Sequence, residues 1–297
     1  ADPVKAGVAY SVWDTLTSPT DQPDDNPHAS FAASYTGPGY FSKTTNGGNT
    51  WSAAKIIFPT GNRNQTIGNQ IVVDPASGAL YDFANLIESP NSVTKTNSLI
   101  AFVKSIDGGD HWTAPQVVTR MDPVFDFNAI GVVDPNTGQI IRTGDIIPEP
   151  AIDPITGALY VAWQDSDFTD RQTDQIAIST SKDRGATWSA PSRVSVNTPD
   201  NRSAFTGTVK VNASGHVAVT YYDFRNLQSG NTTTLPTDYW ARVSKDGGAT
   251  FGPETHLAGS FDMLTAPYAR GFFVGDYEGI GVSGNTFYPV FVQANSG

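Results

Sequence analysis

One stretch recurs four times along the chain, and its clearest copy is Ser105-Ile-Asp107-Gly-Gly109-Asp-His-Trp112. In such a segment the Asp side chain can accept backbone N–H bonds, the glycine can adopt a positive φ, and the aromatic ring can pack between sheets. The four copies are Ser42–Trp51, Ser105–Trp112, Ser181–Trp188 and Ser244–Phe251. The last three share the pattern S-x-D-x-G-x-x-[W/F], whereas the first carries two extra residues and has Asn46 in the Asp position. The repeat predicts four hairpins of one design.

A second phrase precedes most of these hairpins and predicts a tight turn between two strands. It reads Asp74-Pro-Ala-Ser-Gly78-Ala-Leu-Tyr81 in one place and Asp153-Pro-Ile-Thr-Gly157-Ala-Leu-Tyr160 in another. Degenerate versions occur in Val211–Val217 and Val282–Phe287. The longest insertion, Met121–Gly144, contains Asp134-Pro-Asn-Thr-Gly138, and we expect it to form a small hairpin of its own.

These turns divide the chain into sets of four expected strands. The best-defined set has its strands at Pro148–Asp153, Ala158–Asp165, Gln175–Ser181 and Trp188–Val194. Comparable sets are expected from about Ile67 to Val118 and from about Ala204 to Leu257. The first set begins late, because Gly7–Asp14 has the pattern of a second strand, and the chain ends on two strands at Glu278–Ser283 and Thr286–Val292.

The four hairpin segments resemble the Asp box, the repeat of sialidases and related β-propellers. The resemblance implies an all-β fold, a β-propeller of four-stranded antiparallel blades, in which residues 1–297 form a single domain. A spacing of roughly 60 to 80 residues between boxes suits such blades. Related propellers usually have six blades, whereas this chain shows four boxed blades and a partial one. Either its two ends share a closing blade, or sequence upstream of Ala1 is missing. The resemblance implies a structural role for the box residues, which are Asn46, Trp51, Asp107, Trp112, Asp183, Trp188, Asp246 and Phe251.

Composition narrows the classes of partner. The net charge is −11 and the isoelectric point is near 4.6, so nucleic acid and anionic membrane surfaces are poor partners for the surface as a whole. Cysteine is absent, which excludes disulfides and thiolate chemistry. No apolar run approaches the roughly 20 residues of a membrane span. We expect a secreted or extracellular monomer whose partner is a carbohydrate or glycoconjugate.

The segment Phe273–Gly279 contains the first catalytic candidates, Asp276, Tyr277 and Glu278. The resemblance implies a tyrosine nucleophile assisted by a glutamate, with an aspartate as acid or base. A neighbouring carboxylate would help to activate a phenol, whose pKa is ordinarily near 10. Adjacent residues of a strand point to opposite faces, so Tyr277 and Glu278 are not expected to pair with each other. Glu149, at the start of an inner strand, is the fourth catalytic candidate.

Arginines and further carboxylates supply the candidates for substrate binding. Sialidases hold the substrate carboxylate with three arginines, since a guanidinium binds a carboxylate in a bidentate way. We expect Arg202, Arg225 and Arg270 on the functional face, although the Arg-Ile-Pro motif of sialidases is absent. Asp165 and Asp223 are the carboxylate candidates, because a pair about 5 to 9 Å apart would serve a glycosidase.

No cofactor and no metal site is predicted, and calcium is the one alternative. Asp165-Ser-Asp167-Phe-Thr-Asp170 and Asp21-Gln-Pro-Asp24-Asp25 are rich in the oxygen ligands that calcium prefers, but neither matches an EF-hand loop. The four histidines show no metal-binding spacing.

Three functions remain open from the sequence. The first is a sialidase-like glycoside hydrolase, and the second is a non-catalytic propeller that binds glycan or protein. The third is a polysaccharide lyase on the same scaffold. The missing Arg-Ile-Pro motif favours binding, whereas the carboxylates, tyrosine and arginines at expected channel positions favour catalysis.

Overall fold

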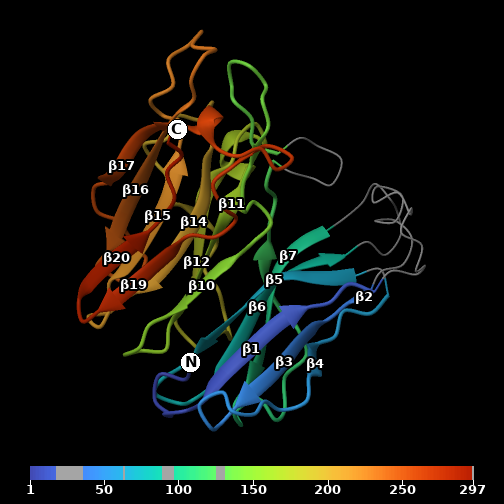
Figure 1. The fold of residues 1–297 in the computed structure, drawn as a ribbon. Helices are drawn as coiled ribbons and strands as arrows, with labels where there is room; N and C mark the ends of the chain where they lie inside the picture. Colours follow the sequence, from blue (N-terminus) through green and yellow to red (C-terminus); the bar gives the residue numbers. More distant parts are fainter. Residues whose placement is uncertain (18–35, 63, 89–96, 125–130, 296–297) are drawn as a thin grey trace. The chain divides into compact units, whose positions relative to one another are not determined.

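The computed structural model describes residues 1–17, 36–62, 64–88, 97–124 and 131–295, and this part of the chain is all-β (Figure 1). Its helices are two 3₁₀ turns, η1 (Asp167–Thr169) and η2 (Met263–Thr265). In the described residues, no helix has the length and hydropathy to span a membrane. The chain divides into two compact units, Ala1–Met121 and Asp122–Gly297, and each is described by itself.

The first unit contains two sheets. One has the strand order β1-β3-β4, and the other has the order β2-β5-β6-β7-β8. All pairs are antiparallel except β2 with β5. The strands are β1 (Ala9–Asp14), β2 (Thr36–Gly37), β3 (Gly39–Thr44), β4 (Lys55–Phe58), β5 (Asn64–Val73), β6 (Leu80–Glu88), β7 (Asn97–Ser105) and β8 (Gln116–Arg120).

The second unit contains two four-stranded antiparallel sheets in simple chain order, β10-β11-β12-β13 and β14-β15-β16-β17. Two small sheets accompany them, the parallel pair β9 and β18 and the antiparallel pair β19 and β20. Their bounds are β9 (Ile141–Arg142), β10 (Glu149–Ile152), β11 (Leu159–Asp165), β12 (Gln175–Ser181), β13 (Ser192–Arg193), β14 (Ala204–Val211), β15 (Val217–Asp223), β16 (Pro236–Ser244), β17 (Thr255–Asp262), β18 (Phe272–Phe273), β19 (Gly279–Ser283) and β20 (Thr286–Val290). The expected four-stranded sets are confirmed as elements, while closure into a propeller and its blade count stay predictions.

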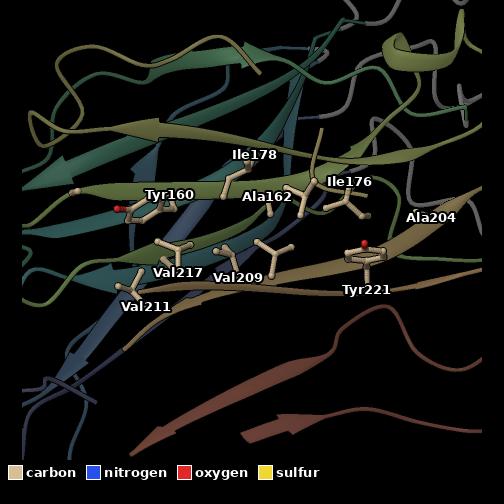
Figure 2. Close-up of a cluster of buried hydrophobic side chains, with 13 residues drawn as sticks. Tyr160, Ala162, Ile176, Ile178, Ala204, Val209, Val211, Val217 and Tyr221 are labelled. Carbon is tan, nitrogen blue, oxygen red and sulfur yellow. The ribbon is translucent and has the colours of Figure 1, made fainter. Parts of the chain in front are cut away.

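The core of the second unit lies between its two large sheets (Figure 2). Ile176 and Ile178 of β12 and Val217, Val219 and Tyr221 of β15 belong to one buried cluster, which β10, β11 and β14 also line. Residues two apart on a strand share a face, so the apolar side chains at alternate positions of β12 and β15 lie on the same side of their sheet. Each such side chain stabilises the fold by about 1.5–3 kcal/mol when it is removed from water.

The four repeated hairpins share one hydrogen-bonded turn. In the third, Ser181 Oγ donates to Asp183 Oδ1 at 2.8 Å, and the backbone N–H of Thr187 donates to the same oxygen at 2.8 Å. The N–H of Gly185, at φ +92°, donates to Ser181 Oγ at 2.8 Å. The Thr187 hydroxyl, which donates to Asp183 Oδ2 at 2.5 Å, lowers the pKa of Asp183 to about 2, followed by the Thr187 N–H and the Ser181 hydroxyl. Asp107 and Asp246 accept the equivalent bonds in their own hairpins.

The first hairpin corrects the alignment expected from the sequence. Thr44 Oγ1, not Ser42 Oγ, donates to Asn46 Oδ1, at 2.9 Å, and accepts the N–H of Gly48 at 3.0 Å. Ser42 Oγ instead donates to the carbonyl oxygen of Ser52 at 2.7 Å. The segment Thr44–Trp51 therefore has the same spacing as the other three copies, and the two extra residues are not an insertion.

The second repeated phrase forms a turn in which Asp caps its own loop. Asp153 Oδ1 accepts the N–H of Ile155 at 2.8 Å, and its Oδ2 accepts the hydroxyl of Thr156 at 2.6 Å. Asp74 and Asp134 make the same pair of bonds. The small hairpin expected around Asp134 is confirmed by the antiparallel bridge between Val133 and Ile140.

Candidate functional site

A pair of oppositely charged side chains links two short strands of the second unit. The parallel pairing of β9 with β18 places Arg142 opposite Phe273, and the guanidinium lies 4.2 Å from the centre of that ring. Arg142 Nη2 donates to Asp276 Oδ2 at 3.0 Å. The exposed fractions of the two side chains are 42% and 27%, so solvent and a ligand can reach both. Asp276, a predicted catalytic residue, thus lies at an accessible position and is paired with Arg142.

Asp145 lies beside this ion pair. Its neighbour Gly144 approaches the backbone of Asp276 so closely that a Cβ on residue 144 would collide with the Asp276 carbonyl oxygen. Burial raises the pKa of Asp145 well above its ordinary value, and the negative charges of Asp174 and Asp276 raise it further. The two neighbouring carboxyl groups therefore differ in their surroundings, since burial and like charges raise the pKa of Asp145 whereas Asp276 is paired with Arg142.

Asp174 and Asp165 are two further aspartates of this region, and both are buried. The charge of Asp174 acts on Asp145, and the charge of Asp165 acts on Asp174. Asp174 accepts the Val124 N–H at 2.7 Å and Gln164 Nε2 at 2.9 Å, and burial raises its pKa to about 7. Asp165, predicted to bind substrate, accepts Trp163 Nε1 at 2.6 Å, and burial raises its pKa to about 6. With an exposed fraction of 4%, Asp165 has little surface to offer a substrate.

Glu278 forms a tyrosine–glutamate pair, but with Tyr222 of β15 rather than with its neighbour Tyr277. The Tyr222 hydroxyl lies 2.9 Å from Glu278 Oε1 and 2.7 Å from the Val292 carbonyl oxygen, and it accepts the Val292 N–H at 2.9 Å. Tyr222 is completely buried, and burial raises its pKa, followed by the charge of Glu278. A buried phenol with a raised pKa is a poor nucleophile.

The Tyr222 hydroxyl has two acceptors within its reach, Glu278 Oε1 and the Val292 carbonyl oxygen. A phenol has one proton to donate, so it can serve one of them at a time. Burial raises the pKa of Glu278 to about 7, and the hydrogen bond from Tyr222 acts in the opposite direction.

Glu149 approaches the same tyrosine cluster from β10. Thr208 Oγ1 lies 3.5 Å from Glu149 Oε2. Tyr239, whose ring centre is 4.5 Å from that of Tyr222, has a pKa raised by burial and then by the charges of Glu278 and Glu149. The charges of the two predicted catalytic glutamates, Glu278 and Glu149, therefore both raise the pKa of Tyr239, whose ring contacts that of Tyr222.

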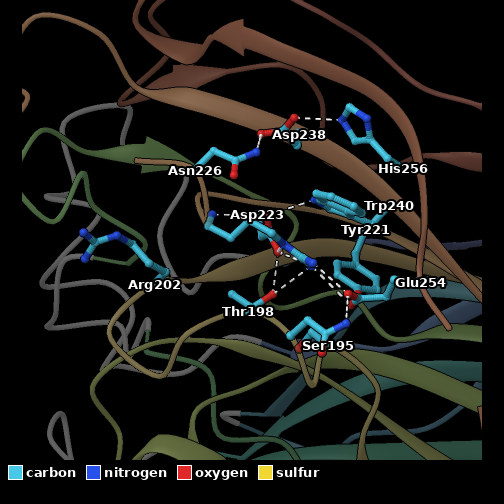
Figure 3. Close-up of polar contacts among 12 residues, drawn as sticks. Ser195, Thr198, Arg202, Tyr221, Asp223, Asn226, Asp238, Trp240, Glu254 and His256 are labelled. Atoms are coloured by element: carbon cyan, nitrogen blue, oxygen red, sulfur yellow. Dashed lines mark hydrogen bonds and ion pairs between the residues drawn. The ribbon is translucent and has the colours of Figure 1, made fainter. Parts of the chain in front are cut away.

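A second charged cluster surrounds Arg225, and its contacts favour a structural role (Figure 3). Arg225 lies within hydrogen-bond distance of Asp223 Oδ2, at 2.5 Å, and of Glu254 Oε2, at 2.7 Å, and its guanidinium stacks on Trp240 at 3.8 Å. Thr198 Oγ1 also donates to Asp223, at 2.5 Å. The exposed side-chain fractions of Arg225, Asp223 and Glu254 are 12%, 0% and 3%. Their charges are paired with one another, so Arg225 and Asp223 have little left for the substrate binding that the sequence predicts.

The other two predicted arginines are not among the contacts of this cluster. Arg202 lies apart from it and donates to the backbone carbonyls of Asn201 and Leu227, at 2.9 and 3.4 Å (Figure 3). Arg270 is exposed and adopts a φ of +65° in the turn before β18. The Asp21–Asp25 segment, the alternative calcium candidate, falls outside the described residues. No group of three or more His, Cys, Asp or Glu side chains suited to a metal ion occurs among the residues described.

Sequence reasoning missed Arg142, Asp145 and the role of Tyr222. Arg142 and Asp145 follow the small Asp134 hairpin in the phrase Ile141-Arg-Thr-Gly-Asp145, where a polar run after a turn is the one available signal. For Tyr222, the sequence pattern predicts only a residue of a strand in the core. Contacts between positions so far apart in the chain have no local signature.

Comparisons with solved structures give distant matches. They include the NanB sialidase of Streptococcus pneumoniae (15% identity, 76% of this chain and 28% of that chain, TM-score 0.45). They also include a Hadza microbial sialidase (15%, 84% and 58%, TM-score 0.41) and an α-L-arabinanase of Penicillium chrysogenum (17%, 76% and 63%, TM-score 0.46). The chain spans less than two thirds of the length of each. No family model and no curated protein matches the chain.

Proposed function

We propose that this chain is a glycoside hydrolase in which Asp145 is the general acid and Asp276 is its ionised partner. The observation that carries the proposal is the contrast between the two carboxyl groups. Asp145 has a pKa raised by burial and by its acidic neighbours, while Asp276 is paired with Arg142 at 3.0 Å. Glycoside hydrolysis needs such a pair, because one group protonates the leaving oxygen and the other stabilises or attacks the sugar carbon.

The remaining side chains position this pair. Arg142 holds the Asp276 side chain through their ion pair and is itself fixed against the Phe273 ring. The charge of Asp174 adds to burial in raising the pKa of Asp145. In this scheme Tyr277, with an exposed fraction of 54%, is a surface on which a sugar ring can stack rather than the nucleophile.

The first testable prediction is that Asp145→Asn removes turnover. A fluorogenic sialoside and a fluorogenic arabinofuranoside are the probes, and fluorophore release is followed from pH 4 to 9. Loss of a general acid typically lowers kcat by about 10²–10⁴-fold, and Asp276→Asn should lower it as strongly. Asp170→Asn is the matched control, since Asp170 is exposed and lies at φ +51°, a conformation that Asn tolerates. A hydrolytic wild type whose rate is unchanged in Asp145→Asn would refute the assignment of Asp145.

A non-catalytic glycan-binding role is the second candidate, and exposed tyrosines support it. Tyr268 and Tyr277 are exposed by 66% and 54%, and Tyr268 packs edge-on against Phe272. Glycan binding by a folded wild type that hydrolyses none of a broad glycoside panel, with affinity lost in Tyr277→Ala, would favour this role. Both roles are compatible with the expected extracellular location, which we retain as a proposal.

A further inference from the structure

The two sheets of the first unit enclose polar side chains in the middle of an apolar cluster. Asp82 of β6 lies between Leu80 and Ala84 on the face that packs against the β1-β3-β4 sheet, and it is completely buried. Asp14 ends β1 on the same face as Tyr10 and Val12, which also pack against this cluster. An aspartate in such surroundings must have a partner, since an isolated buried carboxylate is strongly unfavourable.

Asn69 brings an amide to these carboxyls. It lies in the bulge of β5 between Ile67 and Gln70, and its Nδ2 donates to Asp82 Oδ2 at 2.8 Å. Gly39 makes room for the amide, because a Cβ there would lie 2.7 Å from Asn69 Nδ2.

The same glycine brings Asp14 close. Asp14 pairs directly opposite Gly39 across β1 and β3. Opposite residues have Cβ positions about 4.5–5.5 Å apart, so the Asp14 carboxyl is within reach of the amide of Asn69. In agreement, the charge of Asp14 adds to burial in raising the pKa of Asp82 well above its ordinary value.

Two oxygen atoms of this group are left without a hydrogen bond. Within the described part of the chain, Asp82 Oδ1 and Asn69 Oδ1 are both buried and have no partner. The ion pairs formed by the described residues likewise include neither Asp14 nor Asp82. The group therefore offers acceptor oxygens and two acidic side chains that form no ion pair with another described residue.

We propose that a calcium ion binds between Asp14, Asn69 and Asp82. The ligands on the chain are Asp82 Oδ1, Asn69 Oδ1 and the Asp14 carboxylate, and two carboxylates balance the charge of a divalent cation. Calcium accepts oxygen ligands in flexible geometry and completes its shell with water, whereas magnesium demands a near-ideal octahedron. One of the three ligands is the amide of Asn69, so the site is not one of the groups of three or more His, Cys, Asp or Glu side chains considered above. It does not depend on the proposed hydrolase activity.

The test uses the whole chain after treatment with a chelator. Isothermal titration with CaCl₂ at pH 7 should give one site per chain, and the melting temperature should rise by about 5 °C at a calcium concentration 100 times Kd. Asp82→Asn and Asp14→Asn should each weaken calcium binding at least tenfold. Asp110→Asn is the control, because Asp110 is exposed by 63% in the same unit and pairs with Lys43 instead.

Two results would overturn the proposal. The first is a wild type that neither binds calcium nor melts higher with it, while Asp82→Asn melts higher than the wild type at pH 7. That result would mean that a proton, not a metal, neutralises Asp82. The second is calcium binding that survives unchanged in both Asp14→Asn and Asp82→Asn, which would place the ion elsewhere. Asp14 is only partly buried, so its variant keeps the test decisive should Asp82→Asn fail to fold.

Discussion

At the scale of single residues, the chemistry of this chain depends on carboxyl groups whose pKa burial raises. Asp165, Asp174 and Glu278 have pKa values raised to about 6, 7 and 7, in each case first by burial. Asp276, by contrast, is accessible and paired with Arg142. Residues of one chemical type therefore differ in burial, pairing and pKa according to their surroundings.

Glu278 predicts a specific dependence of stability on pH. Its ordinary pKa of 4.5 applies in the unfolded chain, and its folded value is about 7. Between these values the unfolded state loses its proton first, so the free energy of unfolding falls as pH rises from 4.5 to 7 and then levels. In Glu278→Gln this part of the fall should disappear, a difference on the order of 2 kcal/mol between pH 4.5 and pH 8. Urea unfolding across this range measures it, and superimposable curves for the two proteins would contradict it.

Arg225 predicts a large loss of stability on substitution. Arg225→Ala leaves Asp223 and Glu254 buried without their cation and removes the stacking on Trp240. Breaking a buried ion pair from one side destabilises by about 3–5 kcal/mol. Arg202→Ala is the matched control and should change the free energy of unfolding by less than about 1 kcal/mol, since Arg202 bonds only to backbone carbonyls. Equal effects of the two substitutions in urea unfolding would argue against this reading of the cluster.

At the scale of elements, the hairpins and turns are local devices that fix where each strand ends. The Asp153 side chain satisfies one backbone N–H and one hydroxyl of its own loop. Asn212 performs the same task in the degenerate turn, where its Oδ1 accepts two N–H groups and its Nδ2 donates to the Asn285 carbonyl. The asparagine thus joins its turn to the turn between β19 and β20, which an aspartate could not do.

This contrast predicts how the Asp153 turn responds to substitution. Asp153→Ala removes the acceptor of two part-buried hydrogen bonds, from the Ile155 N–H and the Thr156 hydroxyl, and should destabilise by about 1–3 kcal/mol. Asp153→Asn keeps an acceptor for Ile155, and the Thr156 hydroxyl can rotate to accept from the amide, so its effect should be less than half as large. Chemical denaturation of the three proteins checks the order, and an Asn variant as unstable as the Ala variant would contradict it.

At the scale of the whole molecule, each unit has its own buried core. The first unit is centred on Phe41, Phe58 and Leu80, and the second contains the cluster of Figure 2 and an aromatic one around Tyr222 and Tyr239. The single-domain prediction for residues 1–297 expects these cores to unfold together. Scanning calorimetry should then show one transition with equal calorimetric and van't Hoff enthalpies. Two resolved transitions would replace that prediction with two independently folding domains.

The sequence by itself determined the local structure of this protein. Each turn is encoded within about eight residues, because Asp, Ser or Thr side chains accept hydrogen bonds from backbone N–H groups of the same segment and Gly adopts a positive φ there. The alternation of apolar residues predicts the strands on either side. Only the tertiary structure decided which distant residues meet. The pairs Arg142–Asp276, Tyr222–Glu278 and Asn69–Asp82 join separate strands or loops. The raised pKa values of Glu278 and Asp82 come mainly from burial. Burial and long-range proximity are properties of the packed chain, so Asp276 and Glu278 could be predicted as candidates, whereas Asp145 and its protonated state could not.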